Sequence, residues 1–267
     1  MMKEMEAKVI EIVHEAAKIV DGCSHSIATD KGSKENFATE ADLKVQSFLK
    51  ERLTALIPGS SFLGEEGNYT KGDYTWIVDP IDGTVNYFRD IPLYVISVAL
   101  VRGDDVLIGV IYNPRVNETY HAVEGKGAYL NGKEIHVSDR DMGHSVVCLA
   151  WSVYEKKWSD MCFDISRELF HSCEDIRRLG SAAYELCLIA RGSAEILFEM
   201  RLFPWDYAAG SLILREAGGS ISSVDGPIDY YDQCTVLAAN SDANMDILKK
   251  VVGDRMGTFR ISGSIWK

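Results

Sequence analysis

The segment Trp76–Thr84 constrains this chain more than any other, because an apolar run ends there in two aspartates. The first three residues suit a buried strand, and Pro80 is expected to force a turn directly after Asp79. Asp82 follows within one turn of chain, so both carboxylates are expected to converge at the rim of the core. Carboxylates this close repel each other unless a cation lies between them. The segment therefore predicts a divalent metal ion, with an anion bound against the glycine and threonine that follow.

Composition and charge exclude several classes of function. The chain has 267 residues, enough for one large domain or two smaller ones, and its 46% hydrophobic content is that of an ordinary globular protein. Its net charge of -12 argues against direct binding to nucleic acid or to an anionic membrane. No apolar run approaches the roughly 20 residues that span a bilayer. The six cysteines are scattered without a C-x-x-C pair, so we expect reduced thiols and a cytoplasmic location.

The first half of the chain is expected to be α+β. Helical spacing of apolar residues predicts a long amphipathic helix over Met5–Val20, and the polar stretch Ser24–Asn36 is predicted to be a mobile loop. Thr39 is the expected N-cap of a second helix, with Asp42 in the capping-box position. Runs rich in β-forming residues then extend to Leu130. The pattern predicts two helices packed against a sheet.

The second half is expected to be α/β, because predicted strands and helices alternate after about Val137. Val146–Ala150 is a predicted strand, and a helix is predicted to start at Ser181. We therefore divide the chain into residues 1–140, a half that holds the metal site, and residues 141–267, a half that recognises the substrate. Because no flexible linker separates the two halves, they are expected to pack as one body.

Acidic side chains follow apolar runs at two further places. Glu65 and Glu66 come after one predicted strand, and Asp206 opens a predicted helix. With Asp79 and Asp82 they offer the oxygen ligands that Mg²⁺ prefers, and no histidine or cysteine accompanies them, which disfavours zinc. Taken singly, each group also has a structural explanation: a hairpin turn after Asp82, a solvated loop at Glu65, and a helix N-cap or first-turn acid favoured by the helix dipole at Asp206.

Three segments together carry a resemblance to a known family. Gly64–Glu66, Asp79–Asn86 and Trp205–Gly210 resemble the signature motifs of the inositol monophosphatase family, in that family's order and separation. The resemblance extends from the first helix to about Val252. It implies a layered α/β/α/β/α sandwich of the sugar-phosphatase type, usually a homodimer. It also implies a magnesium-dependent, lithium-sensitive phosphatase that acts on sugar or polyol phosphates.

By matched position, the resemblance implies that two or three Mg²⁺ ions bind in the site. Glu65, Asp79 and the backbone carbonyl of Ile81 would bind the first ion. Asp79, Asp82 and Asp206 would hold the second ion, and Glu65 would also support a more weakly bound third one.

The resemblance also assigns residues around the attacking water. Thr84 would act with Glu65, and with Asp42 behind it, to orient and deprotonate that water. Lys31 matches a lysine that approaches the water when its loop closes, and Glu66 matches an acid outside the principal ligands. Two structural alternatives stay open: Asp42 as a capping acid, and Lys31 as an ordinary solvated lysine.

The phosphate is expected to meet the backbone next to the two aspartates. The N–H groups of Gly83 and Thr84 would hold it beside Asp82, because a helix or turn N-terminus is a natural anion site. Further along the chain, Ser181 and Ala182 lie in a segment that resembles the part of the family whose backbone lines the substrate pocket.

Glu199 matches a glutamate that accepts hydrogen bonds from inositol hydroxyls, and its structural alternative is an exposed acid at a strand end. A carboxylate suits a polyol because it accepts hydrogen bonds from two O–H donors at once. The leading prediction is therefore hydrolysis of inositol 1-phosphate, a small-molecule phosphate ester, by metal-activated water. Fructose-1,6-bisphosphate, NADP and histidinol phosphate stay open as substrates. So does a role as an interaction factor for transcription machinery, which some bacterial members of the family have.

Overall fold

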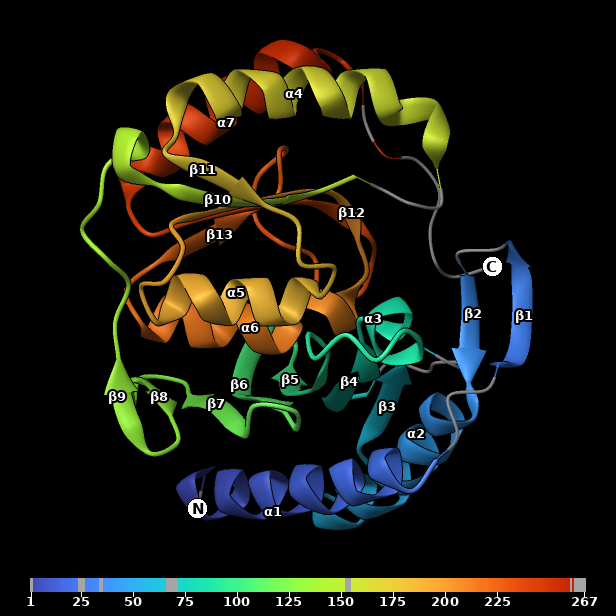
Figure 1. Cartoon of the computed structure of the whole chain (residues 1–267). Helices are drawn as coiled ribbons and strands as arrows, with labels where there is room; N and C mark the ends of the chain where they lie inside the picture. The colour runs from blue at the N-terminus through green and yellow to red at the C-terminus, as the bar shows by residue number, and fades with distance from the viewer. Residues whose placement is uncertain are drawn as a thin grey trace.

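The computed structural model describes residues 2–23, 27–33, 36–65, 72–151, 155–259 and 261, with the backbone alone for 27–33, 36 and 37. Its elements are stacked as α/β/α/β/α layers, which confirms the predicted layered sandwich (Figure 1). Within these residues, no helix is long and apolar enough to cross a membrane.

The first outer layer and the first sheet come from the first half of the chain. Helices α1 (Met2–Asp21) and α2 (Glu40–Leu56) cover one face of a seven-stranded sheet in the order β3-β4-β5-β6-β7-β8-β9 (Figure 1). β3 pairs with β4 in parallel, and every later pair in this sheet is antiparallel. The strands are β3 (Ser61–Gly64), β4 (Tyr74–Asp82), β5 (Val95–Arg102), β6 (Asp105–Asn113), β7 (Glu118–Val123), β8 (Ala128–Leu130) and β9 (Lys133–Ile135).

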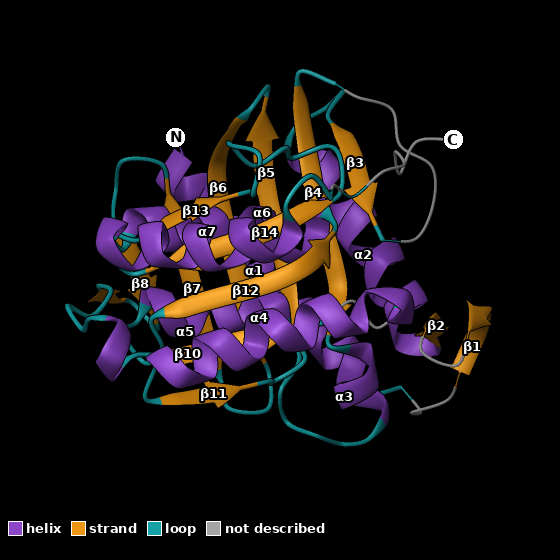
Figure 2. Ribbon diagram, turned by 90° about the horizontal axis from the view of Figure 1, so that it is seen from above, coloured by secondary structure: helices purple, strands orange, loops and turns teal. Residues whose placement is uncertain are grey.

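The remaining layers come from the second half. Helices α5 (Ala182–Ala190) and α6 (Pro204–Glu216) lie between the two sheets, and α4 (Ser159–Ser172) and α7 (Asp242–Met256) cover the outer face of the second sheet (Figures 1 and 2). That sheet has five strands in the order β11-β10-β12-β14-β13, with β10 parallel to β11 and β12. The strands are β10 (Val146–Ala150), β11 (Asp175–Arg177), β12 (Ile196–Leu202), β13 (Ser220–Ser222) and β14 (Cys234–Ala239).

One hydrophobic core joins the two halves, as expected for halves that pack as one body. It includes Ile77 of β4, Leu186 of α5 and Leu197 of β12, all fully buried. The helix α6 lies very close to its neighbours: a Cβ on Gly109 of β6 would stand 2.7 Å from the carbonyl oxygen of Ala209 on α6. Most residues of both middle helices are buried, which explains why their sequences are largely apolar.

The structure corrects the predicted loop Ser24–Asn36. Within the described residues, β1 (Ile27–Ser33) and β2 (Asn36–Thr39) pair in an antiparallel two-stranded sheet. Strands of this kind are held by backbone hydrogen bonds between neighbouring segments, so they need no alternation of apolar and polar side chains. Polarity alone therefore gave the wrong prediction.

A second correction concerns the turn predicted after Asp79. Strand β4 continues through Pro80 to Asp82, and its pairing with β5 is interrupted between Asp79 and Asp82. Such a bulge accommodates proline because one residue there is left out of the hydrogen-bonded ladder.

The hairpin turn considered after Asp82 is also not formed. Gly83 adopts a left-handed conformation with φ 99°, and the short helix α3 (Thr84–Phe88) begins immediately after it. Two single-turn 3₁₀ helices complete the described elements, η1 (Met142–His144) and η2 (Lys156–Trp158). The aspartate segment is thus a bulged strand end that leads into a helix.

Candidate metal and phosphate site

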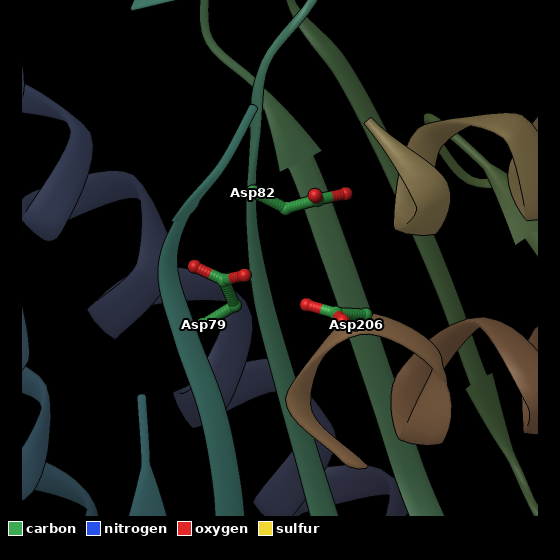
Figure 3. Close-up of side chains that lie close together, drawn as sticks. All are labelled: Asp79, Asp82 and Asp206. Atoms are coloured by element: carbon green, nitrogen blue, oxygen red, sulfur yellow. The ribbon is translucent and has the colours of Figure 1, made fainter. Parts of the chain in front are cut away.

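Three aspartates from two layers of the fold meet at one point. Asp79 and Asp82 lie at the end of β4, and Asp206 lies in the first turn of α6. Each offers one carboxylate oxygen, and these oxygens all lie within 4.8 Å of one another. Figure 3 shows the three side chains projecting into the space between β4 and the start of α6. This spacing suits a shared cation.

The bulge in β4 holds the first of these carboxylates in place. The Oδ1 atom of Asp79 accepts a hydrogen bond of 2.9 Å from the N–H of Ile81. The carbonyl oxygen of Ile81 in turn accepts one of 3.2 Å from the hydroxyl of Thr84. A carbonyl oxygen has two lone pairs, so this contact still allows Ile81 to serve as the predicted metal ligand.

Asp206 is oriented by the start of its own helix. Its Oδ2 atom accepts a hydrogen bond of 2.8 Å from the N–H of Phe203, the residue that caps α6. The hydroxyl of Ser97 on β5 donates to the carbonyl oxygen of Trp205 at 3.3 Å, which ties this end of α6 to the first sheet. Of the two structural alternatives for Asp206, the first-turn acid is confirmed and the N-cap is wrong, because Phe203 occupies that position. The same geometry leaves the carboxylate facing the other two aspartates.

Asp82 is held by the second half of the chain. Its Oδ2 atom accepts hydrogen bonds from the hydroxyl of Ser181 at 2.8 Å and from the N–H of Ala183 at 2.7 Å. Ala182 lies between these two donors and is buried. The structure thus places the predicted substrate segment against a predicted metal ligand.

Burial and mutual repulsion raise the pKa values of all three aspartates. Burial is the main cause of a pKa well above the usual range for Asp79, and the charge of Glu65 adds to it. Burial and then the charge of Asp82 raise the pKa of Asp206 in the same way. The pKa of Asp82 rises to about 6, because burial outweighs the hydrogen bonds from Ser181 and Ala183. A divalent cation bound among these carboxylates would relieve the repulsion.

Glu65 follows β3 and is close enough for its charge to raise the pKa values of all three aspartates. Among the described residues, however, its oxygens are not part of the 4.8 Å group. Glu66 and the side chain of Lys31 lie outside the described residues, and the backbone of Lys31 belongs to β1. The proposed roles of these three residues stay predictions.

Asp42 forms the capping box that the sequence predicts. Its Oδ2 atom accepts a hydrogen bond of 2.7 Å from the N–H of Thr39 and another from the Thr39 hydroxyl. Its charge also contributes to the raised pKa of Asp79. The capping role is therefore confirmed, and a relay to the attacking water stays a prediction.

The predicted phosphate-binding residues lie at the start of α3, directly after Asp82. The first N–H groups of a helix have no partner within it, so this end of α3 is suited to an anion. A Cβ on Gly83 would stand 3.0 Å from the carbonyl oxygen of Leu93 and 3.3 Å from that of Gly180. Glycine is therefore required here both by its positive φ and by the close backbone around it.

Two of the buried glutamates in the second half lie close enough to Asp82 for its charge to raise their pKa values, and the sequence reasoning identified only one of them. Glu199 on β12 is buried, not exposed, and its pKa is raised well above the usual range by burial and by the charge of Glu185. Glu185 on α5 is 1% exposed, and burial raises its pKa to about 8. Its Oε1 atom accepts hydrogen bonds from the N–H groups of Leu179 at 2.7 Å and Gly180 at 3.3 Å. The available signal was a single charged residue in the otherwise apolar helix Ala182–Ala190.

Comparison with known proteins agrees with this geometry. The sequence model of the inositol monophosphatase family matches residues 1–255 of this chain. A "Fructose-1,6-bisphosphatase/inositol-1-monophosphatase" of Aquifex aeolicus is 32% identical over 224 residues, which cover 83% of this chain and 84% of that protein. The "Nus factor SuhB" of Escherichia coli K12 is 33% identical over 217 residues, 80% of this chain and 81% of that protein.

A solved structure shows the same fold. The inositol monophosphatase from Anabaena superposes with a TM-score of 0.83 at 27% sequence identity, over 94% of this chain and 96% of that one. The family match covers nearly all of the described elements, including those that carry the three aspartates. The chain therefore belongs to the inositol monophosphatase family, whose members are metal-dependent phosphatases.

Proposed function

We propose that this protein hydrolyses a phosphate monoester of a polyol or sugar, with inositol 1-phosphate as the leading substrate. The observation that carries the proposal is the meeting of Asp79, Asp82 and Asp206 with their pKa values raised by burial and by one another. Oxygen ligands without nitrogen or sulfur in this group suit Mg²⁺. In this proposal Glu65 and the Ile81 carbonyl complete the ligands of two or three ions.

The residues around the aspartates have separate tasks in this proposal. Bound Mg²⁺ would lower the pKa of a water and neutralise the charge that develops on the leaving oxygen. Thr84, whose hydroxyl is held by the Ile81 carbonyl, orients that water together with Glu65. The N–H groups at the start of α3 bind the phosphate oxygens. Asp42 supports Thr84 and Glu65 in activating the water, and Lys31 would approach that water.

We assign recognition of the leaving group to the second half of the chain. Glu199 accepts hydrogen bonds from hydroxyl groups of the substrate, and Ser181 and Ala182 line the same space. The relative from Aquifex aeolicus is named for both fructose-1,6-bisphosphate and inositol 1-phosphate, and this supports a cyclic polyol or sugar as the leaving group. NADP and histidinol phosphate serve as alternative substrates in the test.

Phosphate release from these four esters, with and without Mg²⁺, tests the proposal directly. We expect release to require Mg²⁺ and to be fastest with inositol 1-phosphate. Asp82→Asn keeps the shape of the side chain and removes its charge, and we expect it to slow release by more than the roughly 10–100-fold that loss of an outer partner of a metal site costs. Asp141→Asn, at a helix cap on the surface, is the matched control. A wild-type rate for Asp82→Asn would contradict the metal assignment.

A second candidate function is suggested by relatives that are named Nus factors. The name of the Escherichia coli protein describes a Nus factor, and the chain is 33% identical to it. An interaction role of this kind would act through protein partners, because the net charge of -12 disfavours direct contact with RNA. Rescue of a deletion phenotype by the Asp82→Asn protein would favour this function over the phosphatase.

We also propose a cytoplasmic homodimer, on the basis of the family resemblance. Light scattering during size-exclusion chromatography tests the mass of the assembly. A mass of about 30 kDa, close to the 29.7 kDa of one chain, would contradict the dimer.

A further inference from the structure

We propose that Glu185 is a positioning residue of the metal site. Its side chain fixes the backbone of the segment Leu179–Ser181, and this segment in turn fixes the orientation of the Asp82 carboxylate. The inference rests on the proposed role of Asp82 as a metal ligand.

The first step is the contact between Glu185 and the backbone in front of its helix. Its Oε1 atom accepts from the N–H of Leu179 at 2.7 Å and from the N–H of Gly180 at 3.3 Å. Both donors lie just before α5, so these hydrogen bonds tie the segment to the helix that follows it.

The same segment is held from its other side by the first half of the chain. The Nδ2 atom of Asn86 on α3 donates to the carbonyl oxygen of Leu179 at 2.7 Å and to that of Leu93 at 2.6 Å. Glu185 thus holds the N–H groups of both peptide groups that flank Leu179, and Asn86 holds the carbonyl oxygen of the second of them. Gly180 follows in a left-handed conformation, with φ 80°.

The last step leads from the segment to the metal site. Directly after Gly180, the hydroxyl of Ser181 and the N–H of Ala183 donate to the same oxygen of Asp82, at 2.8 Å and 2.7 Å. Gly180, which Glu185 holds, is the immediate chain neighbour of Ser181, the first of these two donors. A shift of the segment would therefore turn the Asp82 carboxylate away from the other two aspartates.

A purely structural role does not account for the choice of glutamate. Glu185 is 1% exposed in a helix whose other residues are apolar, and its Oε2 atom is buried without a hydrogen-bond partner in the described structure. Burying a carboxyl group with one unpaired oxygen is unfavourable, and an apolar side chain at this position would pack without that cost. The contact with the segment in front of α5 explains why the acid is placed here.

The test compares three variants of Glu185 in the metal-free full-length protein, with Mg²⁺ binding measured by isothermal titration calorimetry. Glu185→Gln keeps an oxygen acceptor in the same place, and we expect Mg²⁺ affinity within about 3-fold of the wild type. Glu185→Met has the same length and no acceptor, and we expect affinity to fall by about 10-fold or more. Glu185→Asp keeps the carboxyl group but is one methylene shorter, so it is also expected to weaken binding, and it replaces the Glu185→Met variant if that variant does not fold.

The matched control is Glu195→Met. Glu195 lies directly before β12, is buried to the same extent, and accepts hydrogen bonds from the N–H of Val146, the hydroxyl of Ser138 and the guanidinium of Arg140. We expect this variant to lose stability and to keep wild-type Mg²⁺ affinity. In phosphate-release assays, the Glu185→Met protein should need about 10-fold more Mg²⁺ for half-maximal rate and recover its kcat when Mg²⁺ is saturating, which general damage to the fold would not allow.

The outcomes separate the inference from the function on which it rests. Unchanged Mg²⁺ affinity in both Glu185→Met and Glu185→Asp would overturn the positioning role, as would equal losses in Glu185→Gln and Glu185→Met. Asp82→Asn is measured in the same titration. If that variant also binds Mg²⁺ normally, the proposed metal site is wrong; if it binds poorly while the Glu185 variants bind normally, only the inference fails.

Discussion

At the scale of single residues, two opposing effects act on the protonation of Asp82. Its carboxylate accepts two short hydrogen bonds, which favour the charged form, and burial beside other acids favours the neutral form. Burial is the stronger effect, so its pKa rises to about 6. Asp79 and Asp206 experience the same burial and repulsion. In the absence of a bound cation, the fold therefore holds these groups at a cost in free energy.

This cost predicts that the metal-free protein becomes less stable as the pH rises from about 4 to 8. The folded-state pKa of Asp82 lies above the ordinary 3.8, so the native protein binds more protons than the unfolded chain in this interval, and the free energy of unfolding falls as those protons leave. The effect of one such group is on the order of a few kcal/mol. Urea unfolding at several pH values in the presence of EDTA measures it, and excess Mg²⁺ should abolish it.

The Asp82→Asn variant is the control for this prediction, because other carboxyl groups act in the opposite sense. The hydrogen bond from Arg177, for example, lowers the pKa of Asp175, and such a group loses stability as the pH falls. The variant should retain those contributions and show a smaller decline toward pH 8 than the wild type. An equal decline in both proteins would mean that the pKa of Asp82 is not raised.

At the scale of elements, local signals were sufficient where neighbours in sequence make the structure. The capping box of Thr39 and Asp42 and the strand Val146–Ala150 were predicted correctly, because both depend on a few adjacent residues. The bulge before Asp82 and the helix α3 were not predicted. They depend on pairing with β5 and on the backbone that surrounds Gly83, and neither contact is visible in the local sequence.

The contact between β6 and α6 gives a prediction at this scale. In Gly109→Ala the new methyl group would stand 2.7 Å from a backbone oxygen of Ala209, which cannot rotate away, so α6 must move. We expect the free energy of unfolding to fall by about 1–3 kcal/mol. Because α6 carries Asp206, Mg²⁺ affinity should fall as well. Chemical unfolding and calorimetry measure the two effects.

Gly253→Ala is the matched control, because Gly253 lies within α7 and its Cβ would meet no atom within 4 Å. This variant should be as stable as the wild type or more stable by up to about 1 kcal/mol, since alanine favours helices over glycine. Its Mg²⁺ affinity should not change. Equal effects of the two substitutions would show that the close approach of β6 and α6 is unimportant.

At the scale of the whole molecule, the sequence predicted the layers and the three aspartates but not how the site is supported. Motifs identified Asp79, Asp82 and Asp206, because their residue types and order are distinctive. Glu185 was missed because its partners, the N–H groups of the preceding segment, become apparent only in the folded chain. Backbone donors carry no sequence signature, so contacts of this kind are found from coordinates.

The shared core predicts that the two halves do not fold separately. Residues 1–140 and 141–267 meet in one hydrophobic cluster that includes Ile77, Leu186 and Leu197, and separation would expose it to water. We expect each fragment alone to lack a cooperative thermal transition in circular dichroism. A mixture of the two fragments should regain one. A cooperative transition in either isolated fragment would contradict this expectation.

The division of the site between two sheets also bears on how such enzymes diverge after gene duplication. β4 carries Asp79 and Asp82, whereas Glu199 lies on β12 in the other sheet. In the proposed function, mutations around β12 would alter which alcohol is accepted while leaving the proposed cation-binding end of β4 in place. A duplicated copy could therefore acquire a new substrate in small steps without passing through a form that has lost its chemistry.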